Sequence, residues 1–551
     1  MPVIQLSLSR LVTFCKNKAS EKTILETLPY LGLDIEDQSG DYVSVEYSPN
    51  RPDFSSEAGI ARSLVGILGI VIGLPVYDFP RSRIKIRVSG NEIDRVRPCI
   101  RGLYAEILVT DELIKQLIAT QEDLHNGIGR RRSKVAIGIH NAEVISESIE
   151  YYGLTDKNYS FVPLGSTKKQ TVSEILLTTD QGIMYGRLVS KVFPILEDSN
   201  GNVLSMPPII NGDLTRLQPG ISRLFVDITG TDDYAVDTSA AIIASMLSDI
   251  GGRVSRIQIS KINGESEWAP DMTPKKARFD LKLTNDILGF DFDENEARDA
   301  LRKSRLDLNG DIAIIPRFRS DIIHPIDLAE EVALGYGIWK MTPAVVVSSS
   351  VGSLSRRMQK IDSIIEALVG LGLTEIWNLS LSPKELVQRC DFEPLRVDDS
   401  KSRSFEFLRC DITSSLLQVL RGSSHEEYPQ MIFEEAPAFF RSVERSSGVL
   451  EEEHLAVLIA DSTARYSQIK SKLSEFLRLV LPEDIIVKYD ASTDPGEIFA
   501  PGRTAKVSLV IQKDELKIGL VGEVGPSALE KFGISVPVVG FELNLEPLLK
   551  G

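Results

Sequence analysis

The spacing of apolar and polar residues predicts an alternation of short strands and amphipathic helices at the start of the chain. Residues 3–15 (VIQLSLSRLVTFC) begin with the alternation of a strand and continue with helical spacing. Residues 55–75 (SSEAGIARSLVGILGIVIGLP) have the pattern of a helix, with Ser55 or Ser56 as N-cap and Gly-Leu-Pro as its stop. Residues 1–83 are therefore interpreted as an N-terminal α/β domain.

The following segment, residues 84–268, combines strand patterns with two longer helices. Helical spacing runs through residues 111–129 and again through residues 237–252, where Gly-Gly provides a stop. A glycine-containing hairpin is expected over residues 194–211, and a strand over residues 223–232 (RLFVDITGTD). These elements predict a second domain of mixed α and β structure.

Two further domains are expected after residue 268. Residues 269–346 form a small α+β unit, with helix-like patterns at 275–289 and 294–308. Residues 347–551 are rich in strand patterns, and residues 504–524 (TAKVSLVIQKDELKIGLVGEV) predict an antiparallel hairpin. The whole chain is thus expected to be an α+β multidomain protein.

Composition excludes some functional classes but does not identify one. The 551 residues are 42% apolar and 25% charged, which is ordinary for a soluble globular protein. No apolar run is long enough to cross a bilayer, and the N-terminus lacks a secretory signal. The net charge of −16 does not favour a broad nucleic-acid-binding surface, although a local basic patch remains compatible with RNA.

The cysteines are far apart and form no CxxC pair, which argues against a zinc site and against a disulfide framework. A reducing cytoplasm fits this pattern best. The cysteines in question are Cys15, Cys99, Cys390 and Cys410.

Acidic residues gather at the start of a predicted helix in residues 319–337 (RSDIIHPIDLAEEVALGYG). With Asp327 as N-cap and Glu330 at the third helical position, the pattern is a capping box, and Glu331 complements the positive helix end. This interpretation leaves Asp321 unexplained. Crowded carboxylates also suit Mg²⁺, which prefers oxygen ligands. On residue chemistry alone, the cap is favoured over the metal, but the two are not exclusive.

A basic run is the densest positive cluster in this acidic chain, and it comprises Arg130, Arg131, Arg132 and Lys134. Such a run can hold nucleic-acid phosphates, or it can be the solvated end of the preceding helix. The residues alone do not decide between these alternatives. No P-loop is present, no GxGxxG opens a helix, and Ser205, Thr229 and Thr231 have no histidine nearby in sequence.

Several long motifs, in one order, resemble the beta-subunit family of phenylalanine–tRNA ligase, of the archaeal and eukaryotic type. The resemblance extends from the N-terminus to about Leu545. The motifs are NRPDFSSEAGIAR, QEDLHNGIGRRRSKVAIGIHN, LSMPPIINGDLTR, FVDITGTD, RSDIIHPIDLAEEVALGYG, FAPGRTAKVSL and KIGLVGEVGPSALEKFGI.

The resemblance implies a role for each domain. Residues 84–268 would be an editing module, residues 269–346 a small metal-binding domain with a DNA-binding-like fold, and residues 347–551 a class II synthetase-like core. IFEEAPAFF, which begins at Ile432, lacks the preceding arginine of a working class II site, and no glycine-rich motif ending in arginine opens a helix nearby. This core is therefore expected to be non-catalytic and to support the alpha subunit.

The implied assembly is an alpha2beta2 heterotetramer that binds tRNA(Phe), with ATP and phenylalanine bound through the alpha subunit. The chain would support charging of tRNA(Phe) and hydrolyse mischarged tyrosyl-tRNA(Phe). The alternative is a non-catalytic scaffold for tRNA and protein whose editing site is inactive.

The resemblance also assigns site residues. The magnesium ligands would be Asp321, Asp327, Glu330 and Glu331. The basic run, Arg130, Arg131, Arg132 and Lys134, would bind tRNA. In the editing pocket, Leu196 and Asn211 would bind substrate, while Ser205, Asp227 and Thr229 would take part in hydrolysis. No general base is evident, so hydrolysis would depend on a positioned water and the terminal hydroxyl of the tRNA.

Overall fold

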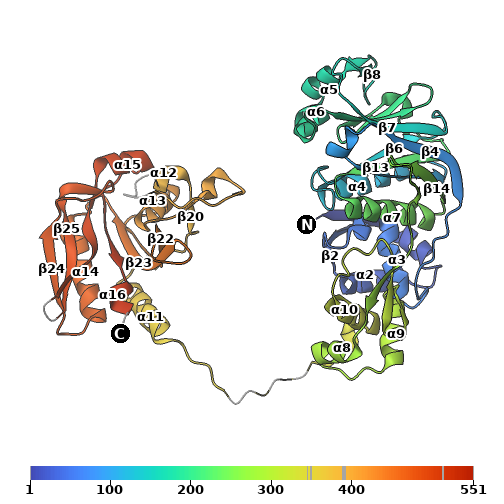
Figure 1. Cartoon of the computed structure of the whole chain (residues 1–551). Helices are drawn as coiled ribbons and strands as arrows, with labels where there is room; N and C mark the ends of the chain where they lie inside the picture. Colours follow the sequence, from blue (N-terminus) through green and yellow to red (C-terminus); the bar gives the residue numbers. More distant parts are fainter. Residues whose placement is uncertain are drawn as a thin grey trace. The chain divides into compact units, whose positions relative to one another are not determined.

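The computed structural model describes residues 2–343, 345, 347, 350–387, 393–511 and 514–549. The chain divides into two compact units, Met1–Val345 and Val346–Gly551. Both contain sheets covered by helices, so the expectation of a mixed α and β multidomain fold is confirmed (Figure 1). Each unit is described by itself.

The first unit begins with a small antiparallel sheet in the order β1 (Val3–Ser7), β3 (Tyr42–Tyr47), β2 (Leu33–Ser39). Helix α3 (Glu57–Ile67) follows, and the Ser56 side chain caps it by accepting from the Gly59 N–H. The helix ends earlier than predicted, because the chain turns through Gly69 with φ of +69°. Buried residues of α3 contact helices of the two neighbouring layers, which joins these parts into one unit.

The central layer of the first unit is a long sheet in which β4 runs parallel to both of its neighbours. Its order is β12 (Ile210–Asn211), β11 (Val203–Met206), β10 (Phe193–Asp198), β7 (Ser148–Leu154), β4 (Arg81–Ser89), β14 (Arg253–Ser260), β5 (Cys99–Glu106), β13 (Arg223–Gly230) and β6 (Val135–Asn141). The predicted hairpin over residues 194–211 is present as the antiparallel pair β10–β11.

Strand alternation in β13 separates two cores. Leu224, Val226 and Ile228 pack in the same core as apolar residues of α4 (Asp111–Asn126) and α7 (Asp233–Asp249). Phe225, on the opposite face, belongs to the other core. Because side chains alternate along a strand, Asp227 and Thr229 share the face of Phe225. The helix predicted over residues 237–252 is confirmed, although it begins earlier.

The third layer of the first unit is a small sheet covered by helices. Its strand order is β16 (Lys275–Arg278), β18 (Ile312–Ile315), β17 (Asp307–Asn309), and its helices are α8 (Leu281–Leu288), α9 (Glu294–Lys303) and α10 (Pro325–Tyr336). The prediction of helix over residues 275–289 is wrong for its first part. Residues 275–278 pair with β18, and the helix starts only after Asp280, which caps it.

The second unit is built on a sheet in which only β19–β22 is a parallel pair among the strands described. Its order is β19 (Thr374–Glu375), β22 (Gln430–Arg441), β23 (Val449–Ala460), β27 (Val538–Asn544), β26 (Asp514–Val524), β25 (Phe499–Ile511) and β24 (Ile486–Ala491). Helices α11 (Arg356–Gly370) and α14 (Tyr466–Val480) belong to one core, and α13 (Thr413–Gly422) belongs to another. The predicted hairpin is β25–β26, and the middle of its turn, residues 512–513, lies outside the described residues.

The cysteines differ from the expectation at one position. Cys15 and Cys99 are free thiols, whereas Cys410 is disulfide-bonded, which the argument against a disulfide framework did not anticipate. Cys390 lies outside the described residues. Spacing along a chain does not show which cysteines a fold brings together. Within the described ranges, no helix has the length and apolar character to span a membrane.

Candidate functional site

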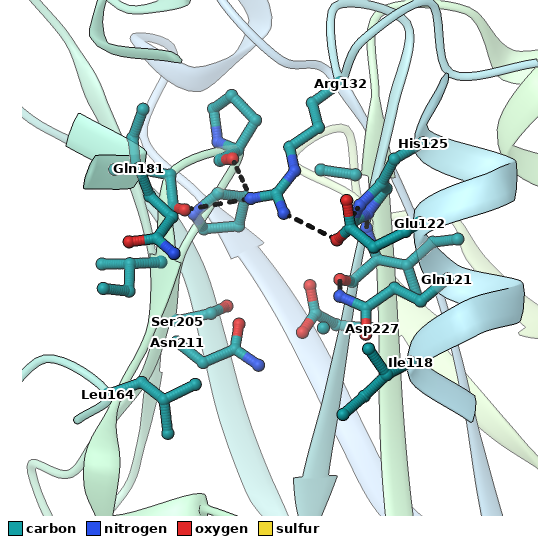
Figure 2. Close-up of a pocket in the computed structure, with 17 residues that line it drawn as sticks. Ile118, Gln121, Glu122, His125, Arg132, Leu164, Gln181, Ser205, Asn211 and Asp227 are labelled. Atoms are coloured by element: carbon teal, nitrogen blue, oxygen red, sulfur yellow. Dashed lines mark hydrogen bonds and ion pairs between the residues drawn. The ribbon is translucent and has the colours of Figure 1, made fainter. Parts of the chain in front are cut away.

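A cavity of about 290 Å³ lies in the first unit, between α4, β6 and the β11–β12 hairpin (Figure 2). Its lining includes the side chains labelled in Figure 2, which are Ile118, Gln121, Glu122, His125, Arg132, Leu164, Gln181, Ser205, Asn211 and Asp227. Polar groups therefore converge from α4, from the hairpin and from β13 on a wall that also has apolar parts.

Strand pairing brings Ser205 and Asn211 together at this cavity. Ser205 on β11 pairs with Asn211 on β12 and, on its other side, with Leu196 on β10. The Ser205 hydroxyl is buried and has no hydrogen-bond partner in the protein. Leu196 packs instead in the core that contains Phe225, and it does not line the cavity. Ser205 and Asn211 thus lie side by side at the cavity wall, while Leu196 supports the strand behind them.

Asp227 is almost completely buried, at 1% exposure, at the inner wall of the cavity. Its Oδ2 lies 2.7 Å from His140 Nε2, and His140 Nδ1 lies 2.8 Å from Thr215 Oγ1. Gly138 is paired with Asp227, and a Cβ there would lie 2.1 Å from Asp227 Oδ2. Only glycine at this position therefore leaves room for the carboxylate.

His140 was not predicted from the sequence, because a catalytic histidine was expected only close in sequence to a serine or threonine. The signal available was strand alternation in VAIGIHN, which places Gly138 and His140 on one face of β6. What the sequence did not supply was the pairing of β6 with β13, which sets Asp227 beside that face.

Thr229 lies two residues beyond Asp227 but outside the cavity lining. Its hydroxyl accepts from Arg97 Nε at 2.9 Å, and its carbonyl accepts from Arg97 Nη2 at 2.7 Å. Burial lowers the pKa of Arg97 to about 10, so its guanidinium stays charged at neutral pH. Arg97, which sequence reasoning did not identify, thereby places a buried positive charge behind Thr229.

The basic run lies in a turn after α4, not in the last turn of the helix. Helix α4 ends at Asn126, and Arg130, Arg131 and Arg132 all have left-handed φ values, between 46° and 64°. The interpretation as a helix C-terminus is therefore wrong. Arg130 and Arg131 are exposed, and Lys134 Nζ forms an ion pair with Asp232 at 2.6 Å.

Arg132 turns from the basic run into the cavity (Figure 2). Its guanidinium contacts Glu122 at 2.9 Å, donates to the Ile209 carbonyl at 3.1 Å, and lies 4.4 Å from the Tyr185 ring centre. A hydrogen bond with His125, together with Arg132, lowers the pKa of Glu122 to about 2 against the effect of burial. The rim of the cavity thus carries a fixed arginine beside two exposed ones.

The acidic cluster of residues 319–337 differs from the predicted cap. Helix α10 begins at Pro325, with His324 as N-cap, so the prediction of Asp327 as N-cap is wrong. Asp327 is the third helical residue, and its Oδ2 accepts from the N–H groups of Ile323 at 2.8 Å and His324 at 2.7 Å. A capping box exists, but it is shifted toward the N-terminus, because proline suits the first helical position.

Arg319 neutralises two of the four predicted magnesium ligands. Its guanidinium is 3% exposed and contacts Asp321 Oδ2 at 2.6 Å and Glu331 Oε1. Burial alone would raise the pKa of Asp321, but Arg319 outweighs it and holds that pKa at about 2. Glu330 is exposed, and partial burial and the surrounding carboxylates raise its pKa.

The four acids do not fit a magnesium site in this arrangement. Arg319 occupies two of them, Asp327 caps α10, and in the described part of the chain no group of three or more His, Cys, Asp or Glu residues is placed to hold a metal. Magnesium therefore stays a prediction, and no chemistry is derived through it.

The second unit offers no exposed acid at the position of a class II motif. Glu434 on β22 is completely buried, and it contacts Arg409 Nη1 at 2.7 Å and Asn378 Nδ2 at 2.7 Å. Its carboxylate thus holds neighbouring segments of the protein together.

Comparison with known proteins places the whole chain in one family. A family model described as the phenylalanyl tRNA synthetase beta chain CLM domain matches residues 342–545, and the tRNA synthetase B5 domain matches residues 277–338. The phenylalanine–tRNA ligase beta subunit of Methanocaldococcus jannaschii is 34% identical over 567 residues, covering 99% of this chain and 100% of that protein. The corresponding subunit of Archaeoglobus fulgidus is 35% identical over 563 residues, covering 99% and 98%.

A solved structure agrees for the first unit. The N-terminal fragment of the phenylalanyl-tRNA synthetase beta-subunit from Pyrococcus horikoshii aligns with a TM-score of 0.58 at 29% identity, covering 61% of this chain and 99% of that fragment. From the identity and coverage of its relatives, this chain belongs to the beta-subunit family of phenylalanine–tRNA ligase.

Proposed function

We propose that this chain, beyond the role in phenylalanine charging that its family carries, hydrolyses tyrosyl-tRNA(Phe) in the cavity of its first unit. Charging itself takes place in the alpha subunit of an alpha2beta2 assembly, which binds ATP and phenylalanine. The observation that carries the editing proposal is the convergence of Ser205, Asn211 and Asp227 on one cavity.

The cavity suits an aminoacyl group in size and chemistry. Its volume of about 290 Å³ is near the lower end of ~300–1,000 Å³, the range of small-molecule sites. An apolar pocket rejects an added hydroxyl by only about a hundredfold, so a charging site alone discriminates poorly against tyrosine. A second pocket that rewards the phenol with hydrogen bonds provides the missing selectivity. Asp227, the buried acceptor at the inner wall, takes the phenol in this proposal.

In this proposal the turn that carries Arg130, Arg131 and Arg132 binds the end of the tRNA as it enters the cavity. Arg132 lines the cavity, and Arg130 and Arg131 are exposed on the same turn. Arginines placed in this way can contact the phosphates nearest the esterified adenosine. The Ser205 hydroxyl, buried and without a protein partner, positions the attacking water, and the terminal ribose hydroxyl of the tRNA assists. Thr229 and Leu196 act from behind the wall, through Arg97 and through packing.

The second unit serves as a scaffold for the alpha subunit in this proposal. Its β22 has no arginine ahead of the acids, and Glu434 is already bonded to Arg409 and Asn378. It therefore lacks the preceding arginine, and Glu434 is not free to bind substrate at this position.

The test is deacylation of tyrosyl-tRNA(Phe) and phenylalanyl-tRNA(Phe) by the assembled alpha–beta complex. Asp227→Asn should slow tyrosyl-tRNA hydrolysis by tenfold or more, about the worth of one charged hydrogen bond, and should leave phenylalanine charging intact. Asp198→Asn is the matched control, because Asp198 is a buried carboxylate of the same sheet outside the cavity.

Parent-like hydrolysis by Asp227→Asn would reject the pocket assignment. If the parent complex itself fails to hydrolyse tyrosyl-tRNA(Phe), the chain is the alternative, a scaffold with an inactive editing site.

A further inference from the structure

A chain of buried polar groups extends from Asp227 away from the cavity. His140 is 0% exposed and Thr215 is 1% exposed. Their contacts are Asp227 Oδ2 to His140 Nε2 at 2.7 Å, His140 Nδ1 to Thr215 Oγ1 at 2.8 Å, and Thr215 Oγ1 to the Gly212 carbonyl at 3.3 Å. The chain thus begins at the inner wall of the cavity and ends on a backbone acceptor.

The acceptor at the end of the chain allows two proton arrangements. If the Thr215 hydroxyl donates to the Gly212 carbonyl, Thr215 Oγ1 must accept from His140 Nδ1–H. One proton then lies between His140 Nε2 and Asp227 Oδ2 in addition to the proton on Nδ1. If Thr215 instead donates to Nδ1, neutral His140 donates its Nε2–H to an ionised Asp227. The two arrangements differ by one proton.

Other charges face this pair from the surrounding elements. Arg97 acts on Asp227 through space, whereas Tyr151 of β7 is a neutral phenol, because burial raises its pKa, and it donates to the Arg97 carbonyl at 2.8 Å. Glu122, His125 and Arg132 line the same cavity as Asp227. Arg97 and Arg132 favour the arrangement with the fewer protons, and Glu122 opposes them.

We propose that His140 and Thr215 are positioning residues that hold a proton behind Asp227 and so set its charge toward the hydroxyl of the ligand. The inference rests on the proposed editing function and goes beyond it. With the fewer protons, Asp227 is an anion and its other oxygen accepts strongly from a phenol. With the additional proton, Asp227 is a weaker acceptor, so selectivity for the tyrosyl ester falls at low pH.

The first experiment measures the pH profile of kcat/KM for tyrosyl-tRNA(Phe) hydrolysis by the assembled complex. His140→Gln keeps a donor near the position of Nε2 but cannot store a proton, and Thr215→Val removes the acceptor of Nδ1–H. In both variants the acidic inflection should move to lower pH by about one unit or more, a tenfold loss of proton affinity. A residue with a merely structural role would change the rate and leave the inflection in place. Unchanged inflections in both variants would overturn the proposal.

A second measurement does not depend on editing activity. The chain has only 5 histidines, so imidazole nitrogen NMR of the parent chain, labelled at histidine, can follow each ring between about pH 5 and 8. The ring-nitrogen shifts of His140 should report a change of charge or tautomer with pH in the parent, and that change should be absent in Asp227→Asn. Ring-nitrogen shifts of His140 that show neither a change of charge nor a change of tautomer with pH in the parent refute the proton chain, even if His140→Gln does not fold. Absence of tyrosyl-tRNA hydrolysis in the parent would reject the editing function and leave this NMR result to decide the proton chain separately.

Discussion

Replacing Arg319 with methionine tests whether an internal guanidinium, and not an ion, balances the acidic cluster. Arg319→Met leaves two carboxylates, Asp321 at 11% side-chain exposure and Glu331 at 7%, without their shared cation. Methionine fills similar space without charge, so the variant removes mainly the ion pairs. Glu331 must then protonate or remain buried as an unpaired charge, while Asp321 keeps only Arg51, whose Nε lies 3.9 Å from Asp321 Oδ2.

The structure gives the magnitude. The pKa of Asp321 falls from an ordinary 3.8 to about 2, which corresponds to roughly 2 kcal/mol of stability at neutral pH from this residue. Glu331 adds a second broken pair, and removing one partner of a buried pair costs about 3–5 kcal/mol. We therefore expect Arg319→Met to lower the free energy of unfolding of the first unit by about 3–5 kcal/mol at pH 7. The part due to Asp321 is present above pH 3.8 and disappears as the pH falls toward 2, because its folded pKa is depressed.

The assay is calorimetric and chemical unfolding of the full chain, with and without saturating Mg²⁺. Arg278→Met is the matched control, because Arg278 is 80% exposed and its ion pair with Asp311 is long, with 3.8 Å between Nε and Oδ2. An exposed pair of this kind contributes about 0–1 kcal/mol. Destabilisation by Arg319→Met no greater than that of the control would refute the role assigned to Arg319.

The remaining predictions concern the metal, the basic turn, the missing chemistry and a buried acid. If the cluster binds Mg²⁺, the ion should stabilise the parent complex against heat, and the double variant Asp327→Asn/Glu330→Gln should lose that stabilisation. The variant should keep most of the helix cap, because an asparagine oxygen can still accept from the Ile323 and His324 N–H groups. No Mg²⁺ effect on the parent rejects the ion. Charge reversal at Arg130 and Arg131 should weaken tRNA binding. It should also reduce the slope of the logarithm of the binding constant against the logarithm of salt concentration, by about one for each phosphate that these arginines neutralise in the parent. An unchanged slope contradicts the tRNA assignment. The chain without an alpha subunit should form no phenylalanyl-tRNA from ATP, phenylalanine and tRNA, and turnover in a preparation free of that subunit would disprove the scaffold role. Burial and neighbouring carboxylates raise the pKa of Glu435 to about 8, so stability of the second unit should fall as the pH rises from 4.5 to 8, and Glu435→Gln should flatten this dependence in pH-resolved melting curves.

Local pattern was sufficient for the elements whose apolar positions repeat with one period. The helix over residues 111–126 was predictable, because an amphipathic helix turns its apolar stripe toward a core. The helix over residues 233–249 was predictable because its long run of apolar and small residues, almost all of them buried, ends on a Gly-Gly stop. The Ser56 cap and the alternation of residues 223–230 were predictable for similar local reasons. The strand over residues 275–278 was not predictable from local pattern. This short segment comes just before a helix in the sequence, and it is a strand because it pairs with β18.

The sequence by itself determined which chemical groups the chain carries and, through its long motifs, the family to which it belongs. The tertiary structure decided which of those groups meet. Asp227 and His140 are joined by the register of β13 and β6, and Thr229 is bound by an arginine from a distant loop. Arg319 was a residue of the quoted motif, yet its burial between two acids depends on how the helix packs. Strand register and burial arise from contacts between segments remote in sequence, and so local spacing cannot specify them.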